Sequence, residues 1–472
     1  MGGTSTMPTK KEMMKSFFFV WQAQRMKKKG LRRFALGILI LPLVYLALLG
    51  SNSSNLNSWK LQISHWIGSG DASNRLLLQE LVTGANRREL HESGATCVSH
   101  PNSDICVAAG EVRLNAKSST FYLTGGQRLH RSPATVKPYP RKRDLFAMSL
   151  VTEVLLEEVE HPSFAPPCQF YHTAPAMAFS TAGYAGNFYH DMNDLVLSLF
   201  ITSGHFRSRV HLVVVNLANY WVIKYRKILS HLSAHALIAS GGGGVHCFPG
   251  VVVGLKYHNH LDCNASDVPG GRTIVDFKAF LRESFSLKHP RVVVTNGRDR
   301  PPSLVLVSRS KNRVLLNEGE VVRVAEEVGF RVTVADRGLT SRVGVFAEVV
   351  NSCEVMVGVH GAGLANFLFL PRDAVLVQVV PWGLDWVSET YYAVPSKKMG
   401  IRYLEYKTGV EESTLYNQYP KDHPVLADPF SIHSQGYNVS RLLYTEGQNV
   451  TLNVSRFRET LVLALQVIRN GR

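Results

Sequence analysis

The sequence predicts an α/β protein with two Rossmann-like lobes behind an N-terminal single transmembrane anchor. Three observations support this class. Continuous apolar runs such as HLVVVN at 211–216 are typical of parallel strands that are buried on both faces. From 303 to 380 such runs alternate with helical stretches and short connections, which indicates a doubly wound sheet. A proline break, DRPP at 299–302, separates this series from a similar one that begins near Ala174.

The anchor is predicted from the uncharged apolar stretch FALGILILPLVYLALL at 34–49. As a helix it would span about 24 Å, which suits the thinner bilayers of the early secretory pathway. Lys and Arg residues cluster just before it, and no charged residue follows until Lys60. The positive-inside rule therefore predicts that the chain after the anchor lies in the lumen. A cleaved signal peptide, a buried core helix and a nuclear localisation patch are the alternatives for this segment.

The charge of the chain is concentrated at its N-terminus. The net charge is +16, and residues 1–33 hold nine Lys and Arg and one acidic residue. Half of the net positive charge therefore lies beside the anchor, where it acts as an orientation signal. The other half is spread over the rest of the chain, as is ordinary for a protein surface of this size. Because no long basic surface is left to explain, we expect no nucleic-acid partner.

Composition shifts divide the chain into six segments. The stretch at 131–143, with three prolines and many cations, is expected to be an exposed loop. The predicted segments are a cytosolic basic tail at 1–33, the transmembrane signal anchor at 34–50, a lumenal stem at 51–95, an N-terminal lobe at 96–300, a C-terminal lobe at 301–440 and a C-terminal helical segment packing on the body at 441–472.

A lumenal location agrees with the cysteines and the glycosylation sequons. Cys97 and Cys106 flank a turn-rich segment and are candidates for a disulfide, with free buried thiols as the alternative. Cys353 lies in an apolar stretch and is expected to be reduced. No Cys/His spacing typical of zinc occurs, so no structural metal is expected. The N-x-S/T sequons, which are the candidate glycosylation sites, are Asn52, Asn264, Asn438, Asn449 and Asn453.

Two loops of the second lobe follow predicted strands, where open α/β sheets bind ligands. SRSKNR at 308–313 offers cations and hydroxyls, and the planar fork of Arg suits a diphosphate; a solvated basic loop is the alternative. HGAG at 360–363 has small residues at an expected helix N-terminus, where an anion can approach the backbone. The candidate ligand-binding residues are Ser308, Arg309, Lys311, His360, Gly361, Ala362 and Gly363.

In the first lobe the segment at 186–191 follows a predicted strand and opens a helix. His190 and Asp191 are the candidate catalytic residues, since proton removal needs a positioned imidazole or carboxylate. In the structural alternative Asp191 only caps the helix and Asp194 is a first-turn acid favoured by the helix dipole. No Asp-x-Asp follows a strand, which argues against a metal-bridged diphosphate.

Longer stretches recur in the order found in one known family. They are GNFYHDMNDLVLSLF (186–200), LVSRSKNRVLLNEGEV (306–321), VMVGVHGAGLANFLFLP (355–371), VQVVPWGLDW (377–386), YLEYKTGVEESTLY (403–416) and EGQNVTLNVSRFRETL (446–461). Together they resemble glycosyltransferase family 61, and within it the plant Golgi branch that decorates xylan.

The resemblance implies an inverting transferase of the GT-B architecture that uses a UDP-pentose. Its C-terminal lobe would hold the nucleotide sugar, with Arg309 on the diphosphate and the turn at 360–363 near the uridine or the phosphates. Its N-terminal lobe would bind xylan or a xylo-oligosaccharide, and His190 or Asp191 would deprotonate the acceptor. No tightly bound cofactor is implied beyond the UDP-sugar donor, and the need for a divalent metal is left open.

The resemblance also implies a single-pass type II protein of the Golgi membrane with a lumenal catalytic domain. The choice between arabinofuranose and xylose, the acceptor linkage and a Golgi homo- or hetero-complex stay open. Two alternatives stand beside this reading. One is a member of the same family that adds β-1,2-xylose to N-glycans, and the other is a non-catalytic lumenal polysaccharide-binding protein.

Overall fold

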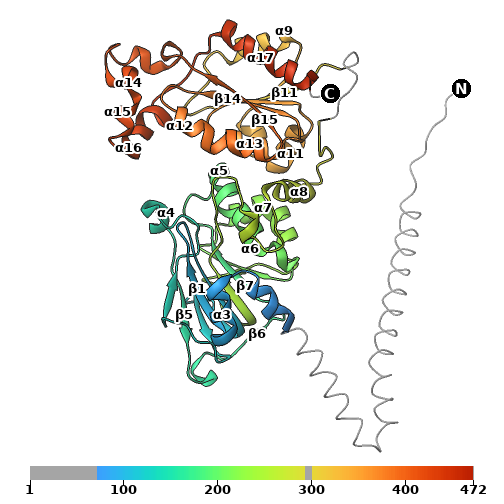
Figure 1. The fold of residues 1–472 in the computed structure, drawn as a ribbon, viewed down its shortest axis with the longest axis vertical. Coiled ribbons are helices and arrows are strands. Elements are labelled where there is room, and N and C mark those ends of the chain that lie inside the picture. Colours follow the sequence, from blue (N-terminus) through green and yellow to red (C-terminus); the bar gives the residue numbers. More distant parts are fainter. Residues whose placement is uncertain (1–71, 293–299, 471–472) are drawn as a thin grey trace, which may run out of the picture. The chain divides into compact units, whose positions relative to one another are not determined.

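Two β-sheets organise the chain in the computed structural model, which describes residues 72–292 and 300–470 (Figure 1). The larger sheet has ten strands in the order β4-β5-β3-β2-β10-β7-β8-β9, with β1 paired to β2 and β6 to β10. The strands are β1 (Ala95–Ser99), β2 (Asp104–Asn115), β3 (Thr120–Leu123), β4 (Ala134–Val136), β5 (Val154–Glu158), β6 (Phe170–Tyr171), β7 (Ala176–Ser180), β8 (His211–Val215), β9 (Ile238–Ala239) and β10 (Val245–Val253).

The larger sheet is mixed, so the prediction of two Rossmann-like lobes in a GT-B arrangement is wrong. Strands β7 and β8 are parallel, as expected, and β9 extends them in parallel, but β2 pairs antiparallel with β1, β3 and β10. Short connections at 100–103 and 116–119 account for the pairings with β1 and β3, because a tight loop can join only antiparallel neighbours. The observed class is a mixed α/β fold.

The transmembrane part of the predicted class has no counterpart in the structure. Within 72–292 and 300–470, no helix is long and apolar enough to cross a membrane. The predicted anchor at 34–50 lies outside these ranges.

The second sheet is entirely parallel, with the order β12-β11-β13-β14-β15. Its direction of growth reverses between β11 and β13, and open α/β sheets bind ligands at such a switch point. Side chains alternate between two cores: Leu304 and Leu306 face one, Val305 and Val307 the other. The strands are β11 (Ser303–Val307), β12 (Arg331–Ala335), β13 (Val355–Val359), β14 (Val375–Val380) and β15 (Arg402–Lys407).

Helices cover both sheets, and one hydrophobic cluster includes residues packed on each. Before residue 292 the helical elements are α3 (Gly84–Ser93), α4 (Leu145–Ser149), η1 (Pro162–Phe164), α5 (Phe188–His190), the π-helical η2 (Asp191–Val196), α6 (Leu197–Ser203), η3 (Gly204–Phe206), α7 (Asn219–Leu232), η4 (Ala265–Asp267) and α8 (Ile274–Ser284). After residue 300 they are α9 (Glu318–Val328), α10 (Arg337–Thr340), α11 (Val343–Asn351), the 3₁₀ element η5 (Ala362–Phe369), α12 (Asp385–Ser388), the π-helical η6 (Glu389–Ala393), α13 (Val394–Lys398), η7 (Val410–Glu412), η8 (Thr414–Asn417), α14 (Pro424–Ala427), α15 (Pro429–His433), α16 (Tyr437–Ser440), the π-helical η9 (Arg441–Glu446) and α17 (Val454–Asn470).

Two disulfides join strands of the larger sheet. Cys97 pairs with Cys106 across β1 and β2, and Cys168 pairs with Cys247 of β10. Cys263 and Cys353 are free and buried. Disulfides persist in oxidising compartments, so these cross-links agree with folding in the secretory pathway.

Replacing Cys168 and Cys247 together by Ser should lower the free energy of unfolding by about 4 kcal/mol, because this bond links residues 79 apart. The matched replacement of Cys97 and Cys106, which are 9 apart, should cost about 2.5 kcal/mol. Urea denaturation of the full chain and both variants measures the difference. Equal losses would contradict the loop-closure explanation.

Four histidines gather beside the second disulfide. His172 Nε2 lies 3.0 Å from His246 Nδ1, and the rings of His211 and His235 stack with centroids 3.9 Å apart. Burial, followed by the charges of His172 and the other neighbouring histidines, lowers the pKa of His211 to about 3. Burial also lowers the pKa values of His172 and His246. The folded protein therefore holds the imidazoles of His172, His211 and His246 neutral.

The free energy of unfolding should fall as the pH drops below about 6.5, because histidines that stay neutral in the folded protein then bind protons in the unfolded chain. His211 alone should contribute a loss on the order of 2 kcal/mol at pH 5. Denaturation of the wild type and of His211→Gln at pH 7 and pH 5 tests this. A variant with the same pH dependence as the wild type would remove His211 as a cause.

Candidate active site

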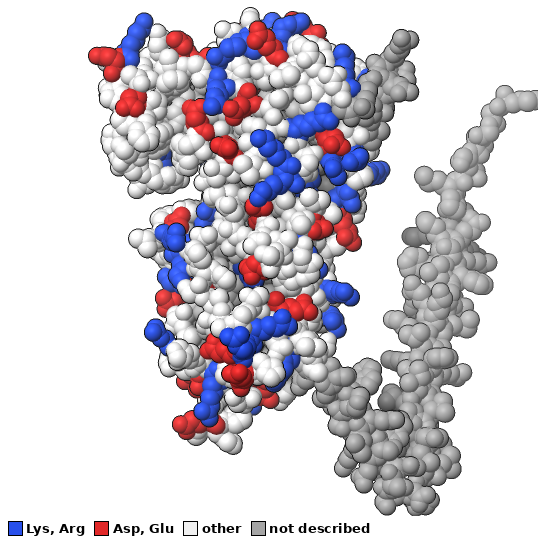
Figure 2. Space-filling view, in the orientation of Figure 1, with Lys and Arg blue, Asp and Glu red and all other residues white. Residues whose placement is uncertain are grey.

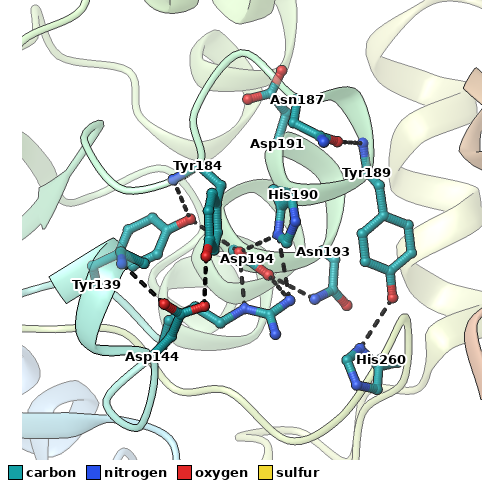
Figure 3. A network of polar contacts seen from close by, with 12 residues as sticks. Tyr139, Asp144, Tyr184, Asn187, Tyr189, His190, Asp191, Asn193, Asp194 and His260 are labelled. Atoms are coloured by element: carbon teal, nitrogen blue, oxygen red, sulfur yellow. Dashed lines mark hydrogen bonds and ion pairs between the residues drawn. The ribbon is translucent and has the colours of Figure 1, made fainter. Parts of the chain in front are cut away.

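A buried carboxylate organises the end of α5 and the π-helical turn that follows it. Asp194 has no exposed surface, and five polar groups contact its two oxygens (Figure 3). Arg141 donates Nη2 to Oδ1 at 2.7 Å and Nε to Oδ2 at 3.0 Å. His190 Nδ1 lies 2.8 Å from Oδ2, Tyr139 donates its hydroxyl to Oδ2 at 2.9 Å, and Asn193 donates to Oδ1.

The charge on Asp194 is strongly favoured. Burial by itself would raise the pKa of Asp194, but the hydrogen bond with His190 and the charge of Arg141 outweigh burial and hold the pKa well below its usual range. The carboxylate therefore fixes Nδ1 of His190 as the protonated nitrogen. Nε2 is left free to accept a proton, which is the arrangement that a general base requires.

Asp191 lies on the same turn, but its carboxylate points away from Asp194 (Figure 3). It is fully buried and accepts hydrogen bonds from Gly186 N at 2.7 Å and from three side chains of α7. The three are Trp221 at 3.0 Å, Lys224 at 3.2 Å and Tyr225 at 2.7 Å. Gly186 has φ +102°, a conformation that favours glycine. Asp191 thus ties the loop before α5 to α7, which leaves His190 as the better placed of the two candidate bases.

A cavity of about 700 Å³ opens beside His190. Tyr184 stacks near His190 with ring centroids 4.5 Å apart and donates its hydroxyl to Asp144 at 2.8 Å. Phe146 and Tyr437 are largely exposed, at 64% and 67%, which leaves aromatic faces open to a ligand. The lining residues are Asn102, Arg141, Arg143, Asp144, Leu145, Phe146, Tyr184, Tyr437, Asn438 and Arg441.

Two arginines stand at the switch point of the parallel sheet. Arg309 follows β11 and donates Nε and Nη2 to Asn312 at 2.9 and 2.8 Å. Arg313 is 7% exposed and donates Nη1 to the carbonyl of His360 at 2.8 Å, while its buried Nε has no partner in the described part of the chain. Burial, followed by the charge of Arg309, lowers the pKa of Arg313 to about 9. Among the described residues, neither guanidinium forms an ion pair with a carboxylate. The two side chains are therefore available to bind an anion.

His360 completes this end of the sheet. Gln378 Nε2 lies 2.9 Å from His360 Nδ1, an arrangement in which Nδ1 accepts and Nε2 carries the proton. Burial and then the charges of Arg313 and Arg309 lower the pKa of His360, so the ring is neutral. The guanidinium of Arg309 packs against Gly361, which has φ +148°. A side chain at 361 would displace that guanidinium.

Aromatic contacts connect the two groups. Tyr189 contacts Tyr391 and Tyr392 of η6, with ring centroids 5.2 and 6.2 Å apart, and lies next to His190 in sequence. Tyr392 in turn contacts His360 at 5.4 Å and donates its hydroxyl to the carbonyl of Gly361 at 2.7 Å. A chain of packed aromatic rings therefore joins the histidine–aspartate pair to the arginine pair.

The other predicted residues are placed as follows. Lys311 is exposed and Ser308 partly exposed beside Arg309, while Ala362 and Gly363 begin η5. Because η5 is a 3₁₀ helix, the α-helix N-terminus expected after HGAG is absent there. The positive charge at this end of the sheet therefore comes mainly from the side chains of Arg309 and Arg313. Among the sequons, Asn264, Asn438 and Asn453 are exposed, Asn449 is partly exposed, and Asn52 lies outside the described residues.

Sequence reasoning missed several residues of this site. The stretch at 131–143 was expected to be an exposed loop, yet Tyr139 is buried and Arg141 ion-pairs with buried Asp194. Asp194 was treated only as a first-turn acid. The spacing of His190 and Asp194, four residues apart, was the available signal.

Among the described residues, no group of three or more His, Cys, Asp or Glu side chains could hold a metal ion.

Replacing Asp194 by Asn should lower the free energy of unfolding by about 3 kcal/mol, because Arg141 would keep its charge without a carboxylate partner. The control is Asp373→Asn, which breaks an exposed ion pair with Arg291 and should cost less than about 1 kcal/mol. Urea denaturation measures both. A loss for D194N no larger than the control would show that Asp194 does not organise this site.

Known proteins match most of this chain. The family model described as Glycosyltransferase 61 matches residues 188–377, which include His190, Arg309 and His360. The chain is 38% identical to alpha-1,3-arabinosyltransferase XAT3 of Oryza sativa subsp. japonica, over 78% of this chain and 64% of the relative. It is 36% identical to beta-1,2-xylosyltransferase XYXT1 of the same plant, over 78% and 83%.

A further relative is xylan glycosyltransferase MUCI21 of Arabidopsis thaliana, which is 34% identical over 76% of each chain. The chain spans slightly less than two thirds of the length of XAT3, but more than three quarters of XYXT1 and MUCI21. Identity above 30% over this extent shows common ancestry along most of the chain. The chain belongs to the glycosyltransferase 61 family.

Proposed function

We propose that this protein transfers a pentose, arabinofuranose or xylose, from a UDP-sugar to xylan or a related cell-wall polysaccharide, with inversion at the sugar C1. One observation carries the proposal: the arginine pair at the switch point has no carboxylate partner among the described residues and is linked by Tyr189 and Tyr392 to a histidine–aspartate pair. The names of the relatives, which are arabinosyl-, xylosyl- and xylan glycosyltransferases, supply the substrate class.

In this proposal Arg309 and Arg313 hold the diphosphate of the donor. Two buried guanidiniums offset its charge, and they stabilise the charge that builds on the leaving UDP more than the charge of the bound donor. The proton on Nε2 of His360 adds a neutral donor to the same place. The hydrogen bond from Gln378 to Nδ1 keeps the proton of the His360 ring on Nε2.

His190 acts as the base. Its Nε2 takes the proton of the acceptor hydroxyl while that oxygen forms a bond to C1 and the bond from C1 to the UDP oxygen breaks. A single displacement of this kind inverts C1. Asp194 stabilises the imidazolium that forms, and Arg141 and Tyr139 keep Asp194 in place.

The acceptor occupies the cavity beside His190. Tyr184, Phe146 and Tyr437 present ring faces there, and polar groups such as Asp144 and Asn102 lie between them. Sugars combine an apolar face with a rim of hydroxyls, so this mixture suits a saccharide chain. We place the reaction in the Golgi lumen, a proposal that the two disulfides support.

The full chain, incubated with a panel of UDP-sugars and xylo-oligosaccharides, should add one pentose to the acceptor. Mass spectrometry detects the gain, and linkage analysis separates arabinofuranose from xylose, which have the same mass. Transfer of a hexose, or transfer only to an N-glycan, would contradict the substrate class. Binding of xylan without transfer from any UDP-sugar would favour a non-catalytic role.

Changing Arg309 or His360 to Ala should abolish measurable transfer, because each removes a donor from the charge that develops on UDP. Removal of one such donor typically costs about 10²–10³ in rate. The control is Arg323→Ala, an exposed residue of α9. Wild-type rates in both R309A and H360A, with normal expression, would remove this site from the reaction.

Changing His190 to Gln should lower kcat by about 10²–10⁴ with little change in the KM for the donor, because a general base acts in the transition state. His231→Gln, an exposed histidine of α7, is the matched control. An unchanged kcat in H190Q would eliminate His190 as the base. The alternative base, Asp191, is tested by Asp191→Asn, whose effect should appear mainly as reduced stability.

A further inference from the structure

A second cavity, of about 290 Å³, lies away from the site described above and is strongly cationic. Its wall includes Lys278 and Arg282 of α8, Arg291 and Arg372, with His289 beside them. No Asp or Glu is among the described residues that line it. Figure 2 shows several Lys and Arg side chains, with Asp and Glu among them, in the region of α8, α11 and α13.

Most of this positive charge is not neutralised. Lys278 donates Nζ to the carbonyl of Leu370 at 2.6 Å, and Arg291 lies 3.6 Å from Asp373. In the part of the chain that the structure describes, Lys278, Arg282 and Arg372 form no ion pair with a carboxylate. Like charges that lie close together repel one another, and an anion between them would offset that repulsion.

The floor of the cavity is apolar. Leu368, Phe369 and Leu370 form it at the end of η5, and Met399 and Leu287 complete it. These side chains are buried, at 8% exposure or less, and the exposed part of the floor consists of Val275, which is 51% exposed, and Ala279 of α8. A bare inorganic ion would use the cations but leave this floor uncovered, whereas an organic body would cover it.

We propose that this cavity binds a small organic molecule that carries a phosphate or sulfate group. The tetrahedral dianion lies among Lys278, Arg282 and Arg372, and the organic part covers Val275 and Ala279. The proposal does not depend on the transferase reaction. The element η5 begins at the HGAG turn and ends at this cavity, so the two sites share one rigid connection.

Calorimetric titration of the full chain with phenyl phosphate tests the site. We expect saturable binding that is tighter than binding of inorganic phosphate, because only the phenyl ring covers the floor. Lys278→Met, which keeps the length of the side chain, and Arg282→Gln should each weaken binding about tenfold or more. The control Arg323→Gln, in an exposed arginine of α9, should leave it unchanged.

Three results would overturn the proposal. They are no saturable binding, equal affinity in the wild type and K278M, or loss of binding in R309A but not in R282Q. The last would place the probe at the nucleotide-sugar site. Equal affinities for phenyl phosphate and inorganic phosphate would overturn the organic part of the proposal. Circular dichroism and the melting temperature of each variant establish that it is folded, and Lys278→Arg, which restores the charge, should recover binding if charge is the cause.

A second measurement uses sulfate, which keeps its charge between pH 6 and pH 8. Burial, followed by the charge of Arg282, lowers the pKa of Lys278 to about 7. Sulfate should therefore bind more tightly at pH 6 than at pH 8, and K278M should lose most of this difference although His289 remains. The same pH dependence in K278M and the wild type would overturn the assignment of Lys278.

Discussion

The buried carboxylate of Asp194 is the interaction on which the active site depends. It contacts Arg141 from the loop before α4, Tyr139 from the same loop, and His190 from its own helical turn. A charge without exposure is tolerated only when donors surround it. This requirement brings two separate segments of backbone together and orients the imidazole at the same time. Folding and chemistry therefore share a single group at this position.

The two sheets contribute in different ways. The parallel sheet places hydrogen-bond donors through its topology, because Arg309 and His360 follow the adjacent strands β11 and β13 at the switch point. The mixed sheet supplies β7, after which the loop to α5 leads to His190. Turns of π-helix carry Asp194, the tyrosines of η6 and Arg441. Such turns are rare and concentrate at functional sites, since they point side chains where a regular helix would not.

Much of the parallel sheet could be predicted from the sequence, because its strands are continuous apolar runs and Gly329 ends α9 in the left-handed conformation. The mixed sheet could not, since β2 has the same apolar appearance as a parallel strand and only its partners reveal its direction. Arg309, His360 and His190 were found from motif and position. Arg141 was hidden in a proline-rich basic loop, and no local pattern shows that Asp194 neutralises it across 53 residues.

The bond between Cys168 and Cys247 has a practical consequence for anyone who makes this protein. It joins the segment before β6 to the central strand β10, which pairs with both β2 and β7. In a host that folds the chain in a reducing compartment this disulfide would not form, and β10 would lack its covalent link to the segment before β6. Recombinant material from the bacterial cytosol and from a secreting eukaryotic host would then differ in quality, although their sequences were identical.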